Sequence, residues 1–290
     1  MNLTLALRLG RISNLPTVWS NVLVGTLLAG GSLGDVRLPL LMLALSLFYV
    51  GGMFLNDAFD REFDARHRPE RPIPSGQVSA QQVFVIGFGL LALGLAGVSL
   101  ASSAADGLPA WRALASGAAL AAAIVYYNAH HKDNPFSPLV MGLCRVLVVL
   151  TAAFSVAQAL PGAVVLASLA LLCHLIGLTY IAKQEHLDRV GSLWPLGFLA
   201  LPGVYGFALA MHRPVVWAWW VLYEAVVIFA LGLLRRRARG DVPRAVVTLI
   251  AGMSVLDGCV LAGAGLVLPA LLAVAAFVLT LALQRWVAGT

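Results

Sequence analysis

The stretch NDAFDREFD, residues 56–64, places three aspartates directly after an apolar run, 38–55, that is long enough to cross a bilayer. On an α-helix, where each residue advances by about 100°, Asn56, Asp60 and Asp64 fall in one strip, with Asp57 at its margin. Like charges at this spacing repel one another. Because Mg²⁺ binds oxygen ligands and typically uses one or two carboxylates together with substrate phosphates, the strip indicates a magnesium–diphosphate site. The alternative is that these are ordinary charges at a membrane–water boundary.

The composition of the rest of the chain predicts an all-α integral membrane protein. Of its 290 residues, 60% are hydrophobic and 11% are charged, and the mean hydropathy is +0.90. One domain, 1–290, is expected. Cys144, Cys173 and Cys259 lie in apolar runs without paired spacing, so we expect core residues and neither metal ligands nor disulfides. Nine spans are predicted, and the apolar run 267–286 could be a tenth: 15–33, 38–60, 80–102, 110–129, 138–160, 162–183, 193–211, 214–234 and 243–266.

The distribution of basic residues predicts the orientation. The net charge is +6, and most of the arginines and lysines lie at the N-terminus and in the loops after the second, fourth, sixth and eighth spans. By the positive-inside rule, the N-terminus and the Asp-rich stretch face the cytoplasm. A multi-pass protein of the bacterial inner (plasma) membrane is therefore expected, and the basic charge is assigned to the membrane and not to nucleic acid.

The loop after the Asp-rich stretch supplies candidate phosphate ligands. Arg68 and Arg71 stand among Pro69, Pro72 and Pro74, which end the helix and stiffen the loop. A stiff loop lowers the ordering cost of holding arginines over a phosphate.

Further polar residues follow later spans. Tyr126-Tyr127-Asn128-Ala129-His130-His131-Lys132 ends the fourth span, where Lys132 could reach a phosphate and the tyrosines also fit an interfacial belt. The adjacent histidines lack a third ligand, so no zinc site is predicted. Arg145 lies inside the fifth span and needs a partner, either an aspartate of the acidic strips or a substrate anion. Glu185 and Asp188, after Lys183, form a second acidic patch at the end of the sixth span. Asp257, inside the ninth span, receives no role.

Together these residues resemble a known family. The pattern Asn56-Asp57-x-x-Asp60-x-x-x-Asp64, followed by Arg68-x-x-Arg71-Pro72-x-Pro74-x-Gly76, is similar to the signature of the UbiA superfamily of intramembrane prenyltransferases. Arg11-x-x-Asn14, Tyr127, Lys132 and the patch at the end of the sixth span stand where that family has further polar segments. The chain departs from the family in the second motif, where Gln184 and Glu185 occupy the neighbourhood of an aspartate.

The resemblance implies a bundle of about nine spans around a central cavity that opens to the cytoplasm. It implies Mg²⁺-dependent transfer of a prenyl group from a polyprenyl diphosphate to a lipophilic acceptor, usually an aromatic ring. Asp60, Asp64 and Asp188 would be catalytic. The metal ligands would come from Asn56, Asp57, Asp60, Asp64, Glu185 and Asp188, and the substrate contacts from Arg11, Asn14, Arg68, Arg71, Tyr127, Lys132, Arg145 and Lys183.

A second class of function stays open on the sequence alone. A transporter or lipid-binding membrane protein could keep this scaffold without the chemistry, and it would bind a ligand without turnover. A CDP-alcohol phosphotransferase would also carry aspartates on membrane helices, but its Asp-Gly and Ala-Arg spacing does not occur here.

Overall fold

The prediction of an all-α chain is confirmed over the part that the computed structural model describes, residues 1–103, 111–132, 134–183 and 194–287, where helices, turns and loops occur without a strand. Each of the ten apolar runs contains a helix. The long helices are α2 (Leu15–Leu28), α3 (Arg37–Phe59), α5 (Ala80–Ser103), α6 (Trp111–His130), α7 (Ser137–Phe154), α8 (Gly162–Lys183), α9 (Ala200–His212, preceded by the 3-10 helix η2, Trp194–Leu199), α10 (Val216–Arg236), α11 (Asp241–Gly263) and α12 (Val267–Leu283).

Seven segments of the described chain are long and apolar enough to cross a membrane, namely α3, α5, α7, α8, the η2–α9 segment, α10 and α11. A chain with so many apolar helices is an integral, multi-pass membrane protein. α2 and α12 are shorter, at 14 and 17 residues. The count of nine or ten spans and the cytoplasmic position of the N-terminus remain predictions.

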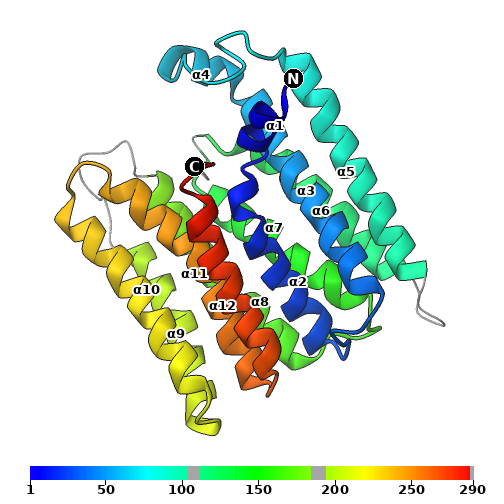
Figure 1. Cartoon of the computed structure of the whole chain (residues 1–290), viewed down its shortest axis with the longest axis vertical. Helices are drawn as coiled ribbons and strands as arrows, with labels where there is room; N and C mark the ends of the chain where they lie inside the picture. The colour runs from blue at the N-terminus through cyan, green and yellow to red at the C-terminus, as the bar shows by residue number, and fades with distance from the viewer. Residues whose placement is uncertain (104–110, 133, 184–193, 288–290) are drawn as a thin grey trace.

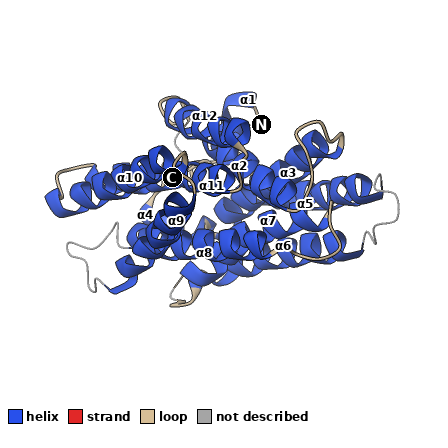
Figure 2. Ribbon diagram, turned by 90° about the horizontal axis from the view of Figure 1, so that it is seen from below, coloured by secondary structure: helices blue, strands red, loops and turns tan. Residues whose placement is uncertain are grey.

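The bundle is organised around α11 and α2. α11 is the most buried of the seven candidate spans, and α2 contacts α3, α7, α8, α11 and α12. Seen from below the view of Figure 1, α9 and α10 lie at one end of an elongated bundle and α3 and α5 toward the other (Figure 2). α7 and α8 pack against each other between these groups. Such an arrangement lets helices from both ends contribute residues to one interior site.

Small residues let neighbouring helices approach closely. Where α3 packs on α5, a Cβ added to Gly51 would lie 2.9 Å from the carbonyl oxygen of Gly87. This contact fixes the C-terminal half of α3 against a neighbour, and that half carries the acidic stretch.

One end of the bundle gathers the short helices and both chain termini (Figure 1). α1 (Leu3–Leu9) buries Leu5 and Leu9 in a small apolar cluster with Phe54 and Ala58 of α3, and η1 (Ile12–Asn14) leads into α2. α4 (Arg61–His67) follows α3 after Asp60. Backbone hydrogen bonds of the i to i+4 kind continue across this junction, from Asp60 to Asn56 and from Asp64 to Asp60. The predicted helical strip is therefore confirmed.

Candidate functional site

A cavity of about 270 Å³ lies between the end that carries α4 and the middle of the bundle. Its mouth is polar and its deeper wall is apolar. The wall comes mainly from α8 and α11, through Leu175, Leu178, Val246, Ile250 and Met253. The polar lining brings together residues from six parts of the chain: Arg11, Asn14, Tyr49, Asn56, Asp60, Arg68, Arg71, Tyr127, His131, Arg145 and Thr179.

Among the described residues, Asp60 is the acidic side chain that lines this cavity. Its Oδ1 lies 2.9 Å from Nζ of Lys132, and its Oδ2 lies 3.5 Å from Nε2 of His131. The Lys132 ammonium also lies over the ring of Phe63, 3.4 Å from its centre. Burial alone would raise the pKa of Asp60, but His131 and Lys132 outweigh it and lower the pKa below its ordinary value. Asp60 is thus an ionised carboxylate held beside a cation.

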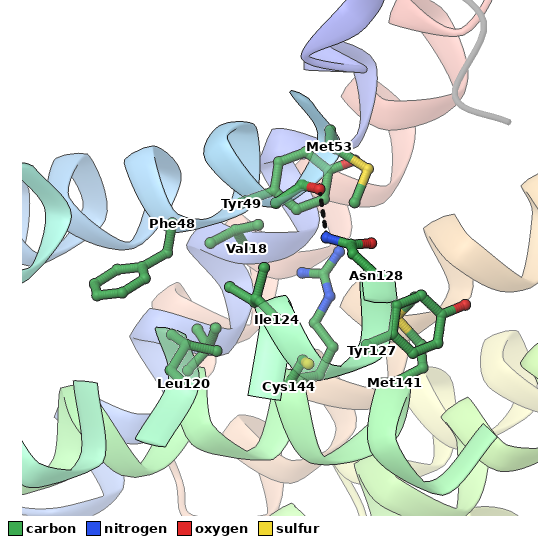
Figure 3. Close-up of a pocket in the computed structure, with 13 residues that line it drawn as sticks. Val18, Phe48, Tyr49, Met53, Leu120, Ile124, Tyr127, Asn128, Met141 and Cys144 are labelled. Carbon is green, nitrogen blue, oxygen red and sulfur yellow. Dashed lines mark hydrogen bonds between the residues drawn. The ribbon is translucent and has the colours of Figure 1, made fainter. Parts of the chain in front are cut away.

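Asn56 and Asp57 are fixed by Arg11. The guanidinium of Arg11 donates to Oδ1 of Asn56 at 3.1 Å and to Oδ1 of Asp57 at 3.3 Å. Asn56 in turn donates to Oδ1 of Asn128, whose own amide donates to the carbonyl of Gly52 (dashed in Figure 3). This chain of bonds orients the Asn56 amide so that its oxygen faces a cation. Arg11 itself has a left-handed backbone, with φ of 43°, which an L-residue rarely adopts unless its surroundings hold it there.

The sequence predicts Asp57 as a metal ligand, but the structure gives it a different role. Its carboxylate is buried and accepts from Arg11 and from Nη1 of Arg71, at 3.4 Å, and it is not part of the cavity lining. Asp57 therefore positions two arginines that do line the cavity.

Asp64 is also buried, 4% exposed, and lies one helical turn beyond Asp60, outside the cavity lining. Burial raises its pKa, the Arg71 charge lowers it, and repulsion from Asp60 and Asp57 raises it further, so that the net shift is upward. A buried carboxylate under repulsion from two neighbours is a group that a divalent cation would stabilise.

An apolar pocket adjoins the cavity and shares Tyr49, Met53, Tyr127 and Met141 with its lining (Figure 3). Its wall is otherwise made by α2, α3, α6 and α7, through Val18, Phe48, Leu120, Ile124 and Val148. The two tyrosines at the end of α6 separate in role. Tyr126 is 50% exposed, as expected for a tyrosine of an interfacial belt. Tyr127 instead lines both the cavity and the pocket.

Arg145 lines both spaces as well. Of the two partners that the sequence predicts, an acidic-strip aspartate is wrong, and a substrate anion stays a prediction. Its Nη1 donates to Oδ1 of Asn21 at 3.3 Å, and its guanidinium lies 5.3 Å from the ring centre of Tyr49. Asp57 pairs with Arg11 and Arg71, and Asp60 pairs with Lys132, so the polar contact of Arg145 comes from α2 instead.

Some of the remaining predicted residues line the cavity, and others lie outside the part of the chain that the structure describes. Arg68 and Arg71 line the cavity. Asn14 lines it too, and its Oδ1 accepts from Gln284, the residue after α12, at 2.5 Å. Lys183 is the last residue of α8, and Glu185 and Asp188 lie outside the described residues.

Sequence reasoning missed several residues that contribute to the site. His131 was noticed only as a poor zinc ligand, and Tyr49, Asn21 and Asp257 received no role. The signal for the last two was present, because polar and ionisable residues inside membrane spans usually serve a function.

The donor set fits Mg²⁺ as part of a ternary site. Across the described residues, no group of three or more His, Cys, Asp or Glu side chains converges as a complete metal site. Asn56 and Asp60 do present hard oxygen atoms to the cavity, beside arginines. This suits a cation that takes few protein ligands and completes its shell with phosphate oxygens and water.

A family model and similar proteins of known name all match this chain to prenyltransferases. The UbiA prenyltransferase family matches residues 18–242. A digeranylgeranylglyceryl phosphate synthase from Methanopyrus kandleri is 32% identical over 213 residues, 73% of each chain. The enzyme of the same name from Ignicoccus hospitalis is 42% identical over 86 residues, 28% of each chain.

Two solved structures share the fold. A UbiA homolog from Archaeoglobus fulgidus, bound to GPP and Mg²⁺, superposes with a TM-score of 0.57 at 14% identity over 88% of this chain and 99% of its own. The apo UbiA homolog from Aeropyrum pernix superposes with a TM-score of 0.53 at 22% identity over 94% and 95%.

Proposed function

This chain belongs to the UbiA prenyltransferase family, and from that membership we propose that it transfers a prenyl group from a polyprenyl diphosphate to a lipophilic acceptor within the membrane. The observation that carries the proposal is the cavity mouth, where the ionised Asp60 and the oriented Asn56 face Arg68 and Arg71 above an apolar interior. A diphosphate with a divalent cation fits the mouth, and a prenyl chain fits the interior.

The donor would bind with its diphosphate at the rim. Asn56, Asp60 and Asp64, with Glu185 and Asp188, are the proposed metal ligands, and Asp60, Asp64 and Asp188 are the proposed catalytic residues. When bound, Mg²⁺ would neutralise charge on the departing diphosphate. Arg68, Arg71, Lys132 and Lys183 are proposed to contact the phosphates, with Arg11 and Asn14 at the same rim. Asp57 contributes mainly by aligning Arg11 and Arg71, since both bind its carboxylate.

The apolar pocket would hold the prenyl chain. The C1–O bond of the donor breaks, its electron pair leaves with the diphosphate, and C1 bonds to the nucleophilic atom of the acceptor, whose proton passes to the diphosphate. Carbocation character develops at C1, and the ring faces of Tyr49 and Tyr127, which line both spaces, would stabilise it. The apolar walls keep water away from C1 until the acceptor attacks.

For the acceptor, the relatives favour a glyceryl phosphate lipid over the aromatic ring that the family resemblance suggested. We further propose that residues 1–290 form one domain, that the cavity opens to the cytoplasm, and that the protein resides in the plasma membrane.

The test is transfer by the purified protein. With Mg²⁺, a series of prenyl diphosphates and a panel of lipid and aromatic acceptors, mass spectrometry should detect a prenylated product, and chelation by EDTA should abolish it. Binding of the diphosphates without product from any acceptor would instead support a lipid-binding or transport protein. The altered second motif, with Gln184 and Glu185 near the place of an aspartate, is the sequence feature that favours this alternative.

A further inference from the structure

Arg145 stands apart from the cations of the rim. It lies eight residues into α7, about 12 Å along the helix axis from Ser137 at 1.5 Å per residue. The arginine is 9% exposed, and what it exposes faces the junction between the cavity and the apolar pocket, since it lines both. A guanidinium at this depth is expensive to bury without an anion.

The guanidinium has bonding capacity that the protein does not use. Arginine has five N–H donors, and across the described residues the structure gives one hydrogen bond for Arg145, to Asn21, together with the contact to the ring of Tyr49. None of the nitrogen atoms of Arg145 is both buried and without a hydrogen-bond partner. Its remaining N–H groups are therefore exposed, and they face the cavity that Arg145 lines.

A buried relay holds Arg145 in this position. Asn21 donates its amide to Oδ2 of Asp257 at 2.7 Å, and the hydroxyl of Ser20 donates to the same oxygen at 2.6 Å. Because the Asn21 nitrogen is committed to Asp257, its oxygen must face Arg145. Asp257 is 3% exposed and lies on α11, while Asn21 lies on α2, so the relay crosses two helices to reach a third.

We propose that Arg145 binds the anionic group of the acceptor, a phosphate or a carboxylate, and that Asn21 and Asp257 are positioning residues for it. This inference rests on the proposed prenyl transfer. In the proposed complex, the donor diphosphate is held by Arg68 and Arg71, which line the cavity but not the apolar pocket, whereas Arg145 lines both. A second anion, bound deeper and beside the apolar pocket, would bring the acceptor nucleophile toward C1 from below.

The arrangement predicts selectivity by charge. An acceptor without the anionic group would leave a desolvated guanidinium with unpaired N–H groups. A hydrogen bond to a charged group contributes about 1.5–3 kcal/mol, so the neutral analogue should bind roughly 10- to 100-fold more weakly.

The experiment separates the acceptor from the donor by equilibrium binding to the full-length protein. The acceptor probes are geranylgeranylglyceryl phosphate and its neutral counterpart geranylgeranylglycerol, and the donor probe is geranylgeranyl thiolodiphosphate with Mg²⁺. Arg145→Met should weaken binding of the phosphate probe at least 10-fold and change binding of the neutral and donor probes less than about twofold. Arg145→Lys should lie between Arg145→Met and the parent.

The positioning role has its own readout. Asp257→Ala should raise the acceptor KM several-fold at an unchanged donor KM, because the Asn21 amide then loses the acceptor of its N–H and is free to turn. The matched control is Arg112→Gln, which removes an arginine that contacts Trp111 away from the cavity and should change none of these constants.

Two results would overturn the inference. One is equal binding of the phosphate and neutral probes by the parent protein, and the other is a loss of donor binding in Arg145→Met as large as the loss of acceptor binding. These binding measurements do not depend on turnover. An absence of prenyl transfer with every acceptor would refute the proposed function, whereas selective binding of the phosphate probe tests the role of Arg145 separately.

Discussion

Replacing Asp60 by asparagine should remove function while leaving the fold in place. The substitution keeps the size of the side chain and removes one charge. It removes a metal ligand in the proposed complex, and it frees Lys132, whose Nζ lies 2.9 Å from Oδ1 of Asp60. It also relieves the repulsion that Asp60 exerts on Asp64.

The magnitudes differ between the free and the bound protein. In the free protein, the lost contact with Lys132 and the relieved repulsion oppose each other. A partly exposed ion pair contributes about 0–1 kcal/mol, so the net change in unfolding free energy should stay within about 1 kcal/mol. In the bound protein, loss of a residue that supports a metal costs at least 10- to 100-fold in affinity or activity, and for a direct ligand we expect about 100-fold or more, about 2.7 kcal/mol.

Thermal unfolding with and without Mg²⁺ and a prenyl thiolodiphosphate measures both terms. At a ligand concentration 100 times the Kd, binding stabilises the folded parent by about 2.7 kcal/mol. If the Kd rises 100-fold in Asp60→Asn, the same ligand concentration contributes only about 0.4 kcal/mol. The control is Glu62→Gln, which removes an exposed carboxylate of the same stretch that pairs with Arg61.

The reasoning is refuted if Asp60→Asn keeps the full ligand-induced shift and the parental rate of prenyl transfer. Equal losses in Asp60→Asn and Glu62→Gln would also count against it, because general electrostatic attraction to the rim would then explain binding without a specific role for Asp60.

Asp64→Asn should raise the melting temperature of the metal-free protein at pH 7. The pKa of Asp64 is raised in the folded protein, so its ionised form destabilises the fold at pH 7, and the gain should disappear as pH falls through that raised pKa toward the ordinary value of an unfolded aspartate. Transfer with Mg²⁺ should drop at least 10-fold. Gly25→Ala should destabilise the fold by about 1–3 kcal/mol, since the new Cβ would overlap the carbonyl oxygen of Val149 where α2 crosses α7. The exposed Gly89→Ala, which meets nothing within 4 Å, should stabilise α5 slightly by helix propensity, and paired denaturation curves check both.

The helices were predictable from the sequence because apolar length is a strong signal. Each predicted run contains a helix, and the acidic strip keeps its helical period through Asp60. The ends were less accurate. The first predicted span, 15–33, corresponds to a helix that ends at Leu28, because the chain turns at Gly30, whose φ is 99°.

The site was predictable in its residue types but less so in its contacts. Asn56, Asp60, Arg68, Arg71 and Tyr127 do meet at one cavity. The sequence could not separate the cavity-lining Asp60 from Asp57, which turns toward two arginines, since both belong to the same helical stretch. Nor could it pair Arg145 with Asn21 and Asp257, because that relay joins residues more than 100 positions apart.

The most direct measurement of the central claim is the location of the metal in a complex with Mn²⁺ and a prenyl thiolodiphosphate, determined by anomalous diffraction. We predict a metal peak about 2.0–2.3 Å from a carboxylate oxygen of Asp60 and close to Asn56, with the diphosphate toward Arg68 and Arg71 and the prenyl chain between Tyr49 and Tyr127. A diphosphate bound without any metal contact to Asn56, Asp60 or Asp64, or a metal bound away from this cavity, would contradict the account.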